Sequence, residues 1–412
     1  MKNVLKSMVI ILLSIVIGFI LLILAYLLPA SRIENNLAKS IKIFKTEKTY
    51  ERDIYKYSST TLDNYTDALM LSNASYAGNK SIIDKSINVY RYSNDKDPYK
   101  SFILQIANKK HKGIGSYSRY WHGYLIVLKP LLMFFSYNDL RYINIITGTL
   151  LVTAIIYLMQ KKKLDEYIPL FVLSILLINP STIFKSLQYS TVFYIFNLAI
   201  LFLLLFNNKM KKKYFYYFLG TGILTSYFDF LTYPLVTLGM PMVFLMILNE
   251  DLNIKERLKT IVLNSIYWMI GYAGMWIGKF ALGTAIFGTS ILKNGVNQIK
   301  ARTSFTARNE NINIINILRR NMDKYINKFT VIILIIILLY ILYKVISKKV
   351  KINKVSVLEI IPFLIICLMP ITWYVVLSNH SYIHHFFTYR TLVITIFSFL
   401  CGTMFVIKKY SK

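Results

Sequence analysis

The sequence is short of the residues that build disulfide-rich, metal-binding and acidic proteins. Its two cysteines, Cys367 and Cys401, lie inside apolar runs, so it offers no disulfide framework and no cysteine-based metal site. Acidic residues are few, with 19 Asp and Glu against 49 Lys and Arg, which gives a formal net charge of +30. There is no internal repeat and no linker or low-complexity tract, which favours one domain over residues 1–412.

Apolar residues are what the chain has in excess. They make up 55% of it, in long runs of Ile, Leu, Phe and Val separated by short basic clusters. Several runs reach the roughly 17 residues that cross a hydrocarbon core, which predicts a polytopic membrane protein. Because the basic clusters alternate with the apolar runs, we attribute the charge to membrane topology and anionic lipid, and we expect no nucleic-acid partner. Richness in Lys, Ile, Asn and Tyr is typical of an AT-rich genome and indicates a Gram-positive bacterium.

The basic clusters also predict which ends of the helices face the cytoplasm. Lys2 and Lys6 place the N-terminus inside, and the apolar run after them is too long for a signal peptide, so we interpret it as an uncleaved span. Requiring the later Lys clusters to face inside gives ten spans in the cell membrane, with both termini cytoplasmic. These spans are 8–28, 141–160, 166–180, 190–207, 214–231, 234–249, 260–281, 329–346, 356–377 and 390–407.

The sidedness depends on the apolar segment 121–137, which must not cross. Lys129 and Pro130 lie in its middle, which fits an interfacial or re-entrant helix better than a straight span. The expected fold is therefore all-α, with a large first outer loop over 30–137 that contains this helix and a second outer loop over 283–328.

The first outer loop contains a pair of carboxylates, Asp63 and Asp67. They are four residues apart and would share one face of a helix, where they could bind a metal ion or act as a general base. The alternative is structural: Asp63 would cap the helix and Asp67 would lie in its first turn, where the helix dipole favours it.

A second group follows in the same loop. Arg119, Trp121, His122 and Lys129 combine aromatic rings with cations, which suits an anionic headgroup or a phosphate. An interfacial aromatic belt with snorkelling cations explains the same pattern.

The third group is the turn before the last span. His380 and His384 have a spacing that can ligate zinc, although no H-E-x-x-H pattern accompanies it. Arg390 is a candidate phosphate clamp, and the histidines could orient a sugar hydroxyl.

In the basic second loop, Arg302 and Arg308 are the candidates for specific contacts, and the remaining charges are interpreted as solvated. The predicted topology adds Gln188, Asp229 and Lys279 on the same side, each of which could also only anchor a helix end.

This layout resembles the GT-C superfamily of polytopic glycosyltransferases, which includes protein O-mannosyltransferases and the aminoarabinose transferases of lipid A. The resemblance rests on one span, a large outer loop with an acidic pair, and Leu128-Lys129-Pro130-Leu131-Leu132, which is similar to a Lys-Pro-Pro-Leu-like stretch of several members. Four blocks also resemble uncharacterised Gram-positive envelope proteins, namely 62–70, 120–132, 229–234 and 379–390. The chain departs from the pattern in one respect: the acidic motif of many members follows the first span closely, where this chain has Glu34.

The resemblance implies transfer of a sugar from a polyprenyl-phosphate donor to a wall polymer, a lipid-linked glycan or a surface protein. A carboxylate would be the base and cations would bind the leaving phosphate; a divalent metal is possible and no other cofactor is expected. A flippase, a transporter or a glycan polymerase remains the alternative, but visible repeats and mid-depth charges, which transporters usually show, are missing from the sequence. The implied catalytic residues are Asp67 and Asp63; the donor-phosphate residues are Arg390, Lys129, Arg119, Lys279, Arg302 and Arg308; the substrate-binding residues are His122, Trp121, Asp229, Gln188, His380, His384, His385 and Tyr389.

Overall fold

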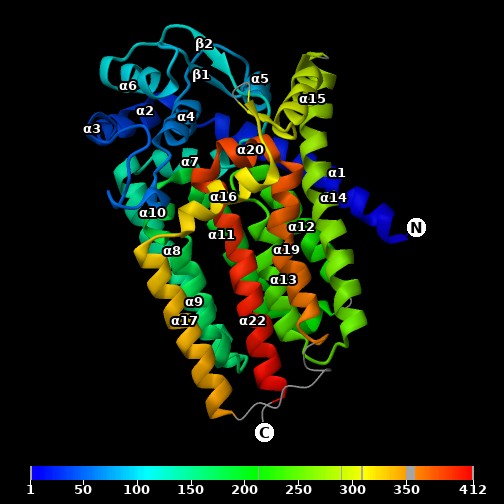
Figure 1. The fold of residues 1–412 in the computed structure, drawn as a ribbon. Helices are drawn as coiled ribbons and strands as arrows, with labels where there is room; N and C mark the ends of the chain where they lie inside the picture. The colour runs from blue at the N-terminus through cyan, green and yellow to red at the C-terminus, as the bar shows by residue number, and fades with distance from the viewer. Residues whose placement is uncertain (1, 212, 289, 308–309, 349–357, 411–412) are drawn as a thin grey trace.

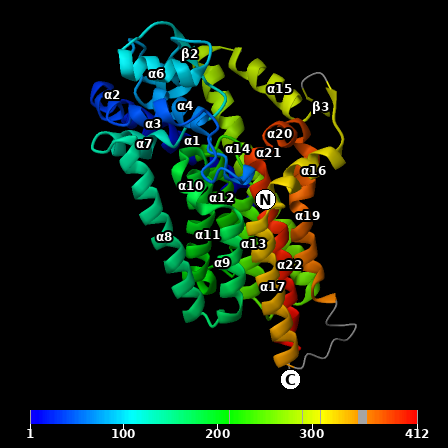
Figure 2. The same ribbon diagram turned by 60° about the vertical axis from the view of Figure 1, so that its left-hand side comes forward.

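The computed structural model describes residues 2–211, 213–288, 290–307, 310–348 and 358–410. It is mostly helical, with two small two-stranded sheets, which confirms the expected all-α class. Long helices form a bundle, and the short elements between α1 and α7 form a cap over one end of it (Figures 1 and 2). We call residues 30–132 the cap and refer to the capped end and the opposite end of the bundle.

Six helices of the described chain are long and apolar enough to cross a membrane. A helix of 20 residues spans about 30 Å, which is the thickness of a bilayer core. This is consistent with a multi-pass membrane protein. Five of the six are α1 (Lys2–Tyr26), α8 (Tyr137–Lys161), α11 (Leu187–Met210), α14 (Ile254–Phe287) and α17 (Lys328–Ser347); the sixth comprises α21 (His385–Thr388), η3 (Tyr389–Leu392) and α22 (Val393–Lys409).

The other four predicted spans contain shorter helices. They are α9 (Ile168–Leu177), which follows η2 (Asp165–Tyr167), α12 (Tyr214–Phe228), α13 (Val236–Leu248) and α19 (Ile361–Val376). At 1.5 Å per residue they rise about 15–24 Å, less than the core thickness. Residues 236–247 of α13 are all buried, so this helix lies inside the bundle, where surrounding protein shields it. The start of the predicted span 356–377 lies outside the described residues.

The bundle is packed closely where α12 meets α14. A Cβ on Gly222 would lie 2.2 Å from the carbonyl oxygen of Trp268, and a Cβ on Gly271 would lie 2.2 Å from that of Leu219. The two backbones can approach this closely only because neither glycine has a side chain, which is a common device for packing helices in membranes.

The cap is built from short helices and one small sheet. Strand β1 (Tyr90–Tyr92) pairs antiparallel with β2 (Ile114–Ser116). The last cap helix, α7, has eight residues and rises about 12 Å, too little to cross a bilayer. The cap helices are α2 (Ala30–Ala38), α3 (Ile41–Thr46), η1 (Ser58–Thr60), α4 (Asn64–Ala74), α5 (Ile82–Asn88), α6 (Pro98–Asn108) and α7 (Leu125–Leu132).

The second predicted outer loop lies at the capped end as well. It forms α15 (Ser290–Arg302), the short strands β3 (Thr306–Ala307) and β4 (Glu310–Asn311), and α16 (Ile314–Tyr325). Together with α20 (Ser378–Ile383), these elements lie beside the cap in both views (Figures 1 and 2). The bundle therefore carries its extramembrane structure, as far as the chain is described, mainly at one end.

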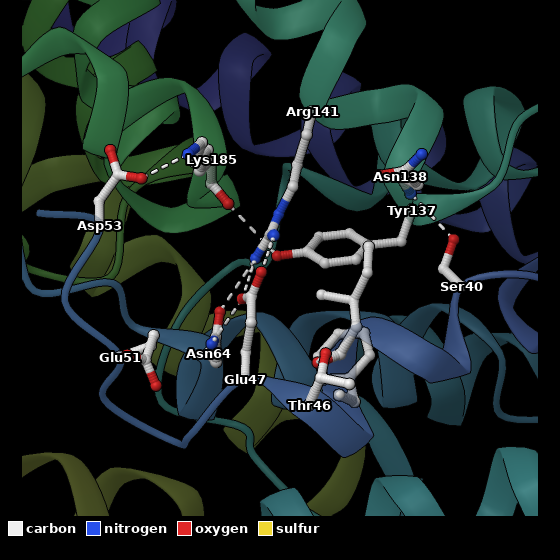
Figure 3. Close-up of polar contacts among 12 residues, drawn as sticks. Ser40, Thr46, Glu47, Glu51, Asp53, Asn64, Tyr137, Asn138, Arg141 and Lys185 are labelled. Carbon is white, nitrogen blue, oxygen red and sulfur yellow. Dashed lines mark hydrogen bonds and ion pairs between the residues drawn. The ribbon is translucent and has the colours of Figure 1, made fainter.

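Polar contacts hold the cap to the bundle (Figure 3). The guanidinium of Arg141, on α8, reaches both carboxylate oxygens of Glu47 at 2.6 and 2.8 Å and also donates to Asn64 Oδ1 at 3.1 Å. Lys185, at the end of α10 (Pro180–Lys185), forms an ion pair with Asp53. Because each pair joins a cap residue to a bundle helix, the cap is fixed in one position over the helix ends.

Candidate functional site

Asp63 caps the N-terminus of α4. One of its carboxylate oxygens accepts from Thr66 N at 3.1 Å and the other from Thr66 Oγ1 at 2.8 Å, which confirms the capping interpretation. Asp63 is buried, with only 2% of its surface exposed. Burial raises the pKa of Asp63 to about 6, against the opposing effects of the Thr66 hydrogen bonds and the positive charge of Arg390. Asp63 is therefore a buried carboxylate that still ionises near neutral pH.

Asp67 has a different neighbourhood, although it is one turn away. Its Oδ2 accepts from Tyr137 Oη at 2.6 Å and from Leu187 N at 3.1 Å, and its Oδ1 accepts from Gln188 N at 3.4 Å. Helix α11 has no side-chain cap of its own, so this carboxylate satisfies its first N–H groups. Burial raises the pKa of Asp67 to about 7. Asp67 thus joins the cap to the start of α11.

The acidic pair does not form a cradle for a metal ion. All four carboxylate oxygens of Asp63 and Asp67 accept hydrogen bonds from protein donors. Within the described ranges, no group of three or more His, Cys, Asp or Glu side chains could hold a metal ion.

Arg390 lies in η3, fully buried beside the cap. Its Nε donates to Ile178 O at 3.0 Å and its Nη1 to Phe386 O at 3.4 Å, while the guanidinium lies 4.2 Å from the centroid of the Tyr189 ring. Its Nη2 has no hydrogen-bond partner in the described structure, and none of the ion pairs found there includes Arg390. A buried cation without an ion-pair partner is costly, which makes Arg390 a candidate for binding an anionic ligand.

The histidine turn contributes neutral groups. Arg302 Nη1 donates to His384 Nε2 at 2.9 Å, and His380 Nε2 donates to Leu231 O at 2.7 Å. Burial, with the nearby charge of Arg302, lowers the pKa of His384 to about 3. The two imidazoles lie 4.7 Å apart, but their Nε2 atoms have different partners, so they do not form a zinc site. The buried Nδ1 of His380 has no partner among the described residues and can accept a hydrogen bond from a hydroxyl group.

Contacts connect these groups into one cluster. Arg390 lies over Tyr189, whose ring centroid is 6.1 Å from that of Phe387, and Phe387 stacks on His384 at 5.2 Å. We define the outer polar cluster, named for the side on which the topology predicted from the sequence places it, as Asp63, Tyr189, Arg302, His380, His384 and Arg390.

Several other predicted site residues border the cluster. Gln188 follows the start of α11 and keeps its Oε1 without a partner among the described residues. Asp229 accepts from Thr232 and shapes the turn that presents Leu231 O to His380. Tyr389 Oη donates to Ser59 O at 2.8 Å, and His385 Nδ1 donates to Tyr382 O at 3.1 Å. These residues mainly hold the local structure.

The remaining predicted residues lie apart from the carboxylates. Trp121 Nε1 donates to Met275 O at 2.7 Å, and Lys279 Nζ donates to Ile87 O at 2.6 Å, so both join α14 to the cap. His122 Nε2 donates to Tyr117 O at 2.6 Å within the cap, whereas Arg119 Nη1 donates to Gln298 Oε1 at 3.0 Å and joins the cap to α15.

Three further candidates are not part of the cluster as the structure describes it. Lys129 Nζ donates to Ala74 O at 2.7 Å, at the opposite end of α4 from Asp63. Glu34, the rival to the acidic pair, has its Oε1 2.8 Å from His111 Nε2 and therefore has a partner of its own. Arg308 lies outside the described residues.

The sequence reasoning missed an apolar groove between α7, α8, α11 and α12. Its volume is about 670 Å³, and its walls include Leu128, Leu198 and Gly220. Its capped end reaches Met70, on the same helix as Asp67, and Leu187, whose backbone N–H donates to Asp67. Apolar residues that line a groove have the same composition as those that face lipid, so no local pattern distinguishes them.

In a comparison with known proteins, no family model, no curated protein and no solved structure matched this chain.

Proposed function

We propose that this protein is a membrane glycosyltransferase that moves a sugar from a polyprenyl-phosphate donor to an acceptor of the cell envelope. The observation that carries the proposal is the buried Arg390, whose Nη2 is unpaired and whose positive charge acts on Asp63. A general base and a phosphate-binding cation, close together at one end of a membrane bundle, are the two groups this reaction needs.

The chemistry follows from the states of these side chains. Asp63, with a pKa near 6, is ionised at neutral pH and takes the proton of an acceptor hydroxyl. The hydroxyl oxygen forms a bond to the anomeric carbon while the bond from that carbon to the phosphate oxygen breaks. The polyprenyl phosphate leaves with the bonding electrons, and Arg390 Nη2 stabilises its charge. Asp67 is a positioning residue, because it fixes the start of α11 beside Asp63.

The groove supports a lipid-linked donor. It is lined largely by aliphatic and aromatic side chains and extends from the cap to Phe202 of α11 and Tyr216 of α12. A polyprenyl chain lying in it would place its phosphate near the start of α11, where Gln188 and Tyr189 belong to or border the outer polar cluster. Aliphatic grooves next to a few convergent polar groups are typical of ligand sites.

The same proposal includes the finer topology. The chain would cross the cell membrane ten times, with both termini in the cytoplasm and the outer polar cluster on the outer face. The clusters Lys161–Lys163 and Lys408–Lys409 would then lie at the cytoplasmic end. The four helices that are shorter than a bilayer core would be accommodated by surrounding protein, as α13 is.

An envelope composition comparison tests the function. A deletion strain should lack one glycosyl substituent that its parent carries, and wild-type protein supplied in trans should restore it. An unchanged glycan composition would contradict the proposal. Accumulation of unexported lipid-linked glycan inside the cell would favour a flippase, and a shortened polymer would favour a polymerase.

A further inference from the structure

Apart from the apolar groove, the structure has a small polar pocket where the cap meets α1. Its volume is about 230 Å³, smaller than the roughly 300–1,000 Å³ of pockets that hold larger organic ligands. Besides Ser31 of α2, four polar side chains line it: Tyr26 from α1, Tyr76 after α4, Lys85 from α5 and Lys129 from α7. The pocket brings together four elements that are distant in the sequence.

This pocket is separate from the outer polar cluster. Lys129 Nζ donates to Ala74 O, at the end of α4, whereas Asp63 caps the beginning of the same helix. An 11-residue helix is about 16 Å long, so the two sites cannot contact one phosphate group.

The charges of the pocket are of one sign. Lys129 is only 1% exposed, and Lys85 is partly buried close enough to oppose its charge. No acidic residue is among the described residues that line the pocket. Asp84 precedes Lys85, but its Oδ1 already accepts from Asn88 and Tyr90. Burial and the charge of Lys85 lower the pKa of Lys129 to about 7, an effect that a bound anion would reverse.

Two buried hydroxyls complete the pocket. Tyr26 and Tyr76 are 7% and 1% exposed, and neither hydroxyl has a hydrogen-bond partner in the described structure. Buried hydroxyls are normally paired, so two unpaired ones beside a pocket are available as hydrogen-bond donors to a ligand. Helix α2 starts at the same place, after Pro29 and without a side-chain cap, so its first N–H groups are available to an anion.

We propose that this pocket binds a phosphate oxyanion, held by the ammonium groups of Lys85 and Lys129, by the hydroxyls of Tyr26 and Tyr76, and by the start of α2. The source is either free phosphate or the phosphodiester of an anionic lipid headgroup, since the pocket lies at the end of the first candidate span. The inference rests on this pocket alone and is independent of sugar transfer.

Thermal unfolding of the full chain in a neutral detergent tests it. Inorganic phosphate is titrated in one arm, and phosphatidylglycerol in mixed micelles in the other, with diacylglycerol as the phosphate-free lipid. We expect a rise in Tm that saturates with one of the two phosphate compounds and is absent with diacylglycerol.

Two variants locate the effect. Lys85→Met, and the double change Tyr26→Phe with Tyr76→Phe, should each weaken the apparent affinity by about tenfold. The phenylalanine variant removes only oxygens that have no partner in the described structure, so it should fold even if substitution of Lys129 does not. Lys100→Met and Tyr55→Phe, at exposed positions outside the pocket, are the matched controls and should leave the affinity unchanged.

The titrations either identify the source of the phosphate group or overturn the proposed site. A response to inorganic phosphate that the variants lose supports the pocket with a free anion as its ligand. A response confined to phosphatidylglycerol, and lost in the same variants, supports a lipid headgroup. No response to either compound, or a response that both variants retain in full, would overturn the proposal.

Discussion

At the end of the bundle opposite the cap, buried cations lie beside carboxylates, whereas at the capped end the most deeply buried cations donate to backbone carbonyl groups. Arg257 is fully buried and lies 3.3 Å from Glu359, which also pairs with Lys409 at 2.7 Å. By contrast, Arg390 and Lys129 are equally buried and take part in none of the ion pairs found in the described structure.

The capped end is not without acidic groups. Glu47 and Asp53 pair with Arg141 and Lys185, and these contacts hold the cap (Figure 3). The difference is therefore selective: Arg141 and Lys185, which attach the cap, have carboxylate partners, whereas Arg390 and Lys129 donate to backbone carbonyl groups. A buried charge that the fold does not neutralise is a candidate for binding a ligand, because the desolvation cost is recovered only when the ligand arrives.

The largest expected effect is on the base. Asp63→Asn keeps the helix cap, because Asn is as good a cap as Asp, but it cannot accept a proton. Transfer of sugar should fall by about 10³-fold, within the usual range for removing a general base. In the wild type the rate should rise with pH through about 6 as Asp63 ionises, and a radiolabelled-donor assay across pH 5 to 8 would measure both effects.

The control for this prediction is Asp97→Asn. Asp97 caps α6 through Tyr99 N, at 2.9 Å, in the same way that Asp63 caps α4. It should retain transfer. Full activity of Asp63→Asn would remove Asp63 from the mechanism.

The next prediction compares how much two buried arginines, at opposite ends of the bundle, contribute to the free energy of unfolding. Arg257→Met leaves Glu359 with one cation instead of two and should cost about 3 kcal/mol, as breaking a buried ion pair does. Arg390→Met should cost about 1 kcal/mol or less, because the two lost hydrogen bonds are offset by removing an unpaired buried charge. Thermal unfolding in detergent compares them, and a larger loss for Arg390→Met would invert the comparison.

The attachment of the cap gives an intermediate effect. Glu47→Gln removes the charge that faces Arg141 and should weaken the cap by about 2 kcal/mol. Hydrogen exchange should rise in α3 and α4 while the bundle stays protected. Glu51→Gln is the matched control, since Glu51 is partly exposed and accepts only from Lys48 N at 3.2 Å, and its exchange should match the wild type.

The smallest effect concerns the groove. A Cβ on Gly220 would meet no atom within 4 Å, so Gly220→Leu can project into the groove without a clash. It should stabilise α12 slightly, by up to about 1 kcal/mol, while raising KM for the lipid donor by about tenfold. Gly220→Ala, which gains helix propensity and adds little volume, should leave KM unchanged. Equal KM values for the two variants would show that the donor chain lies elsewhere.

Local features of the fold could be predicted from the sequence. Asp63 before Asn64 and a helical run was recognised as a possible cap, and Lys129 with Pro130 in a short apolar segment indicated a helix that does not cross. Both inferences depend on neighbours within one or two turns. The long apolar runs likewise predicted the positions of α1, α8, α11, α14, α17 and α22.

Contacts between distant segments could not be predicted. Asp67 satisfies the N–H groups of Leu187 and Gln188, about 120 positions later, and nothing near Asp67 in the sequence indicates that partner. The family resemblance implied one site for Lys129 and Asp63, yet α4 separates them. Whether a cation has a carboxylate partner depends on packing between distant segments. The sequence alone therefore could not separate charges that hold the fold from candidates for ligand binding.

The central claim is that the unpaired cation at the capped end serves a phosphate ligand. The most direct test is complementation of a deletion strain with wild type, Arg390→Met and Arg257→Met, each expressed to equal membrane levels, followed by analysis of envelope glycans. We predict that wild type and Arg257→Met restore the missing glycosyl substituent and that Arg390→Met does not. Restoration by Arg390→Met would contradict the account.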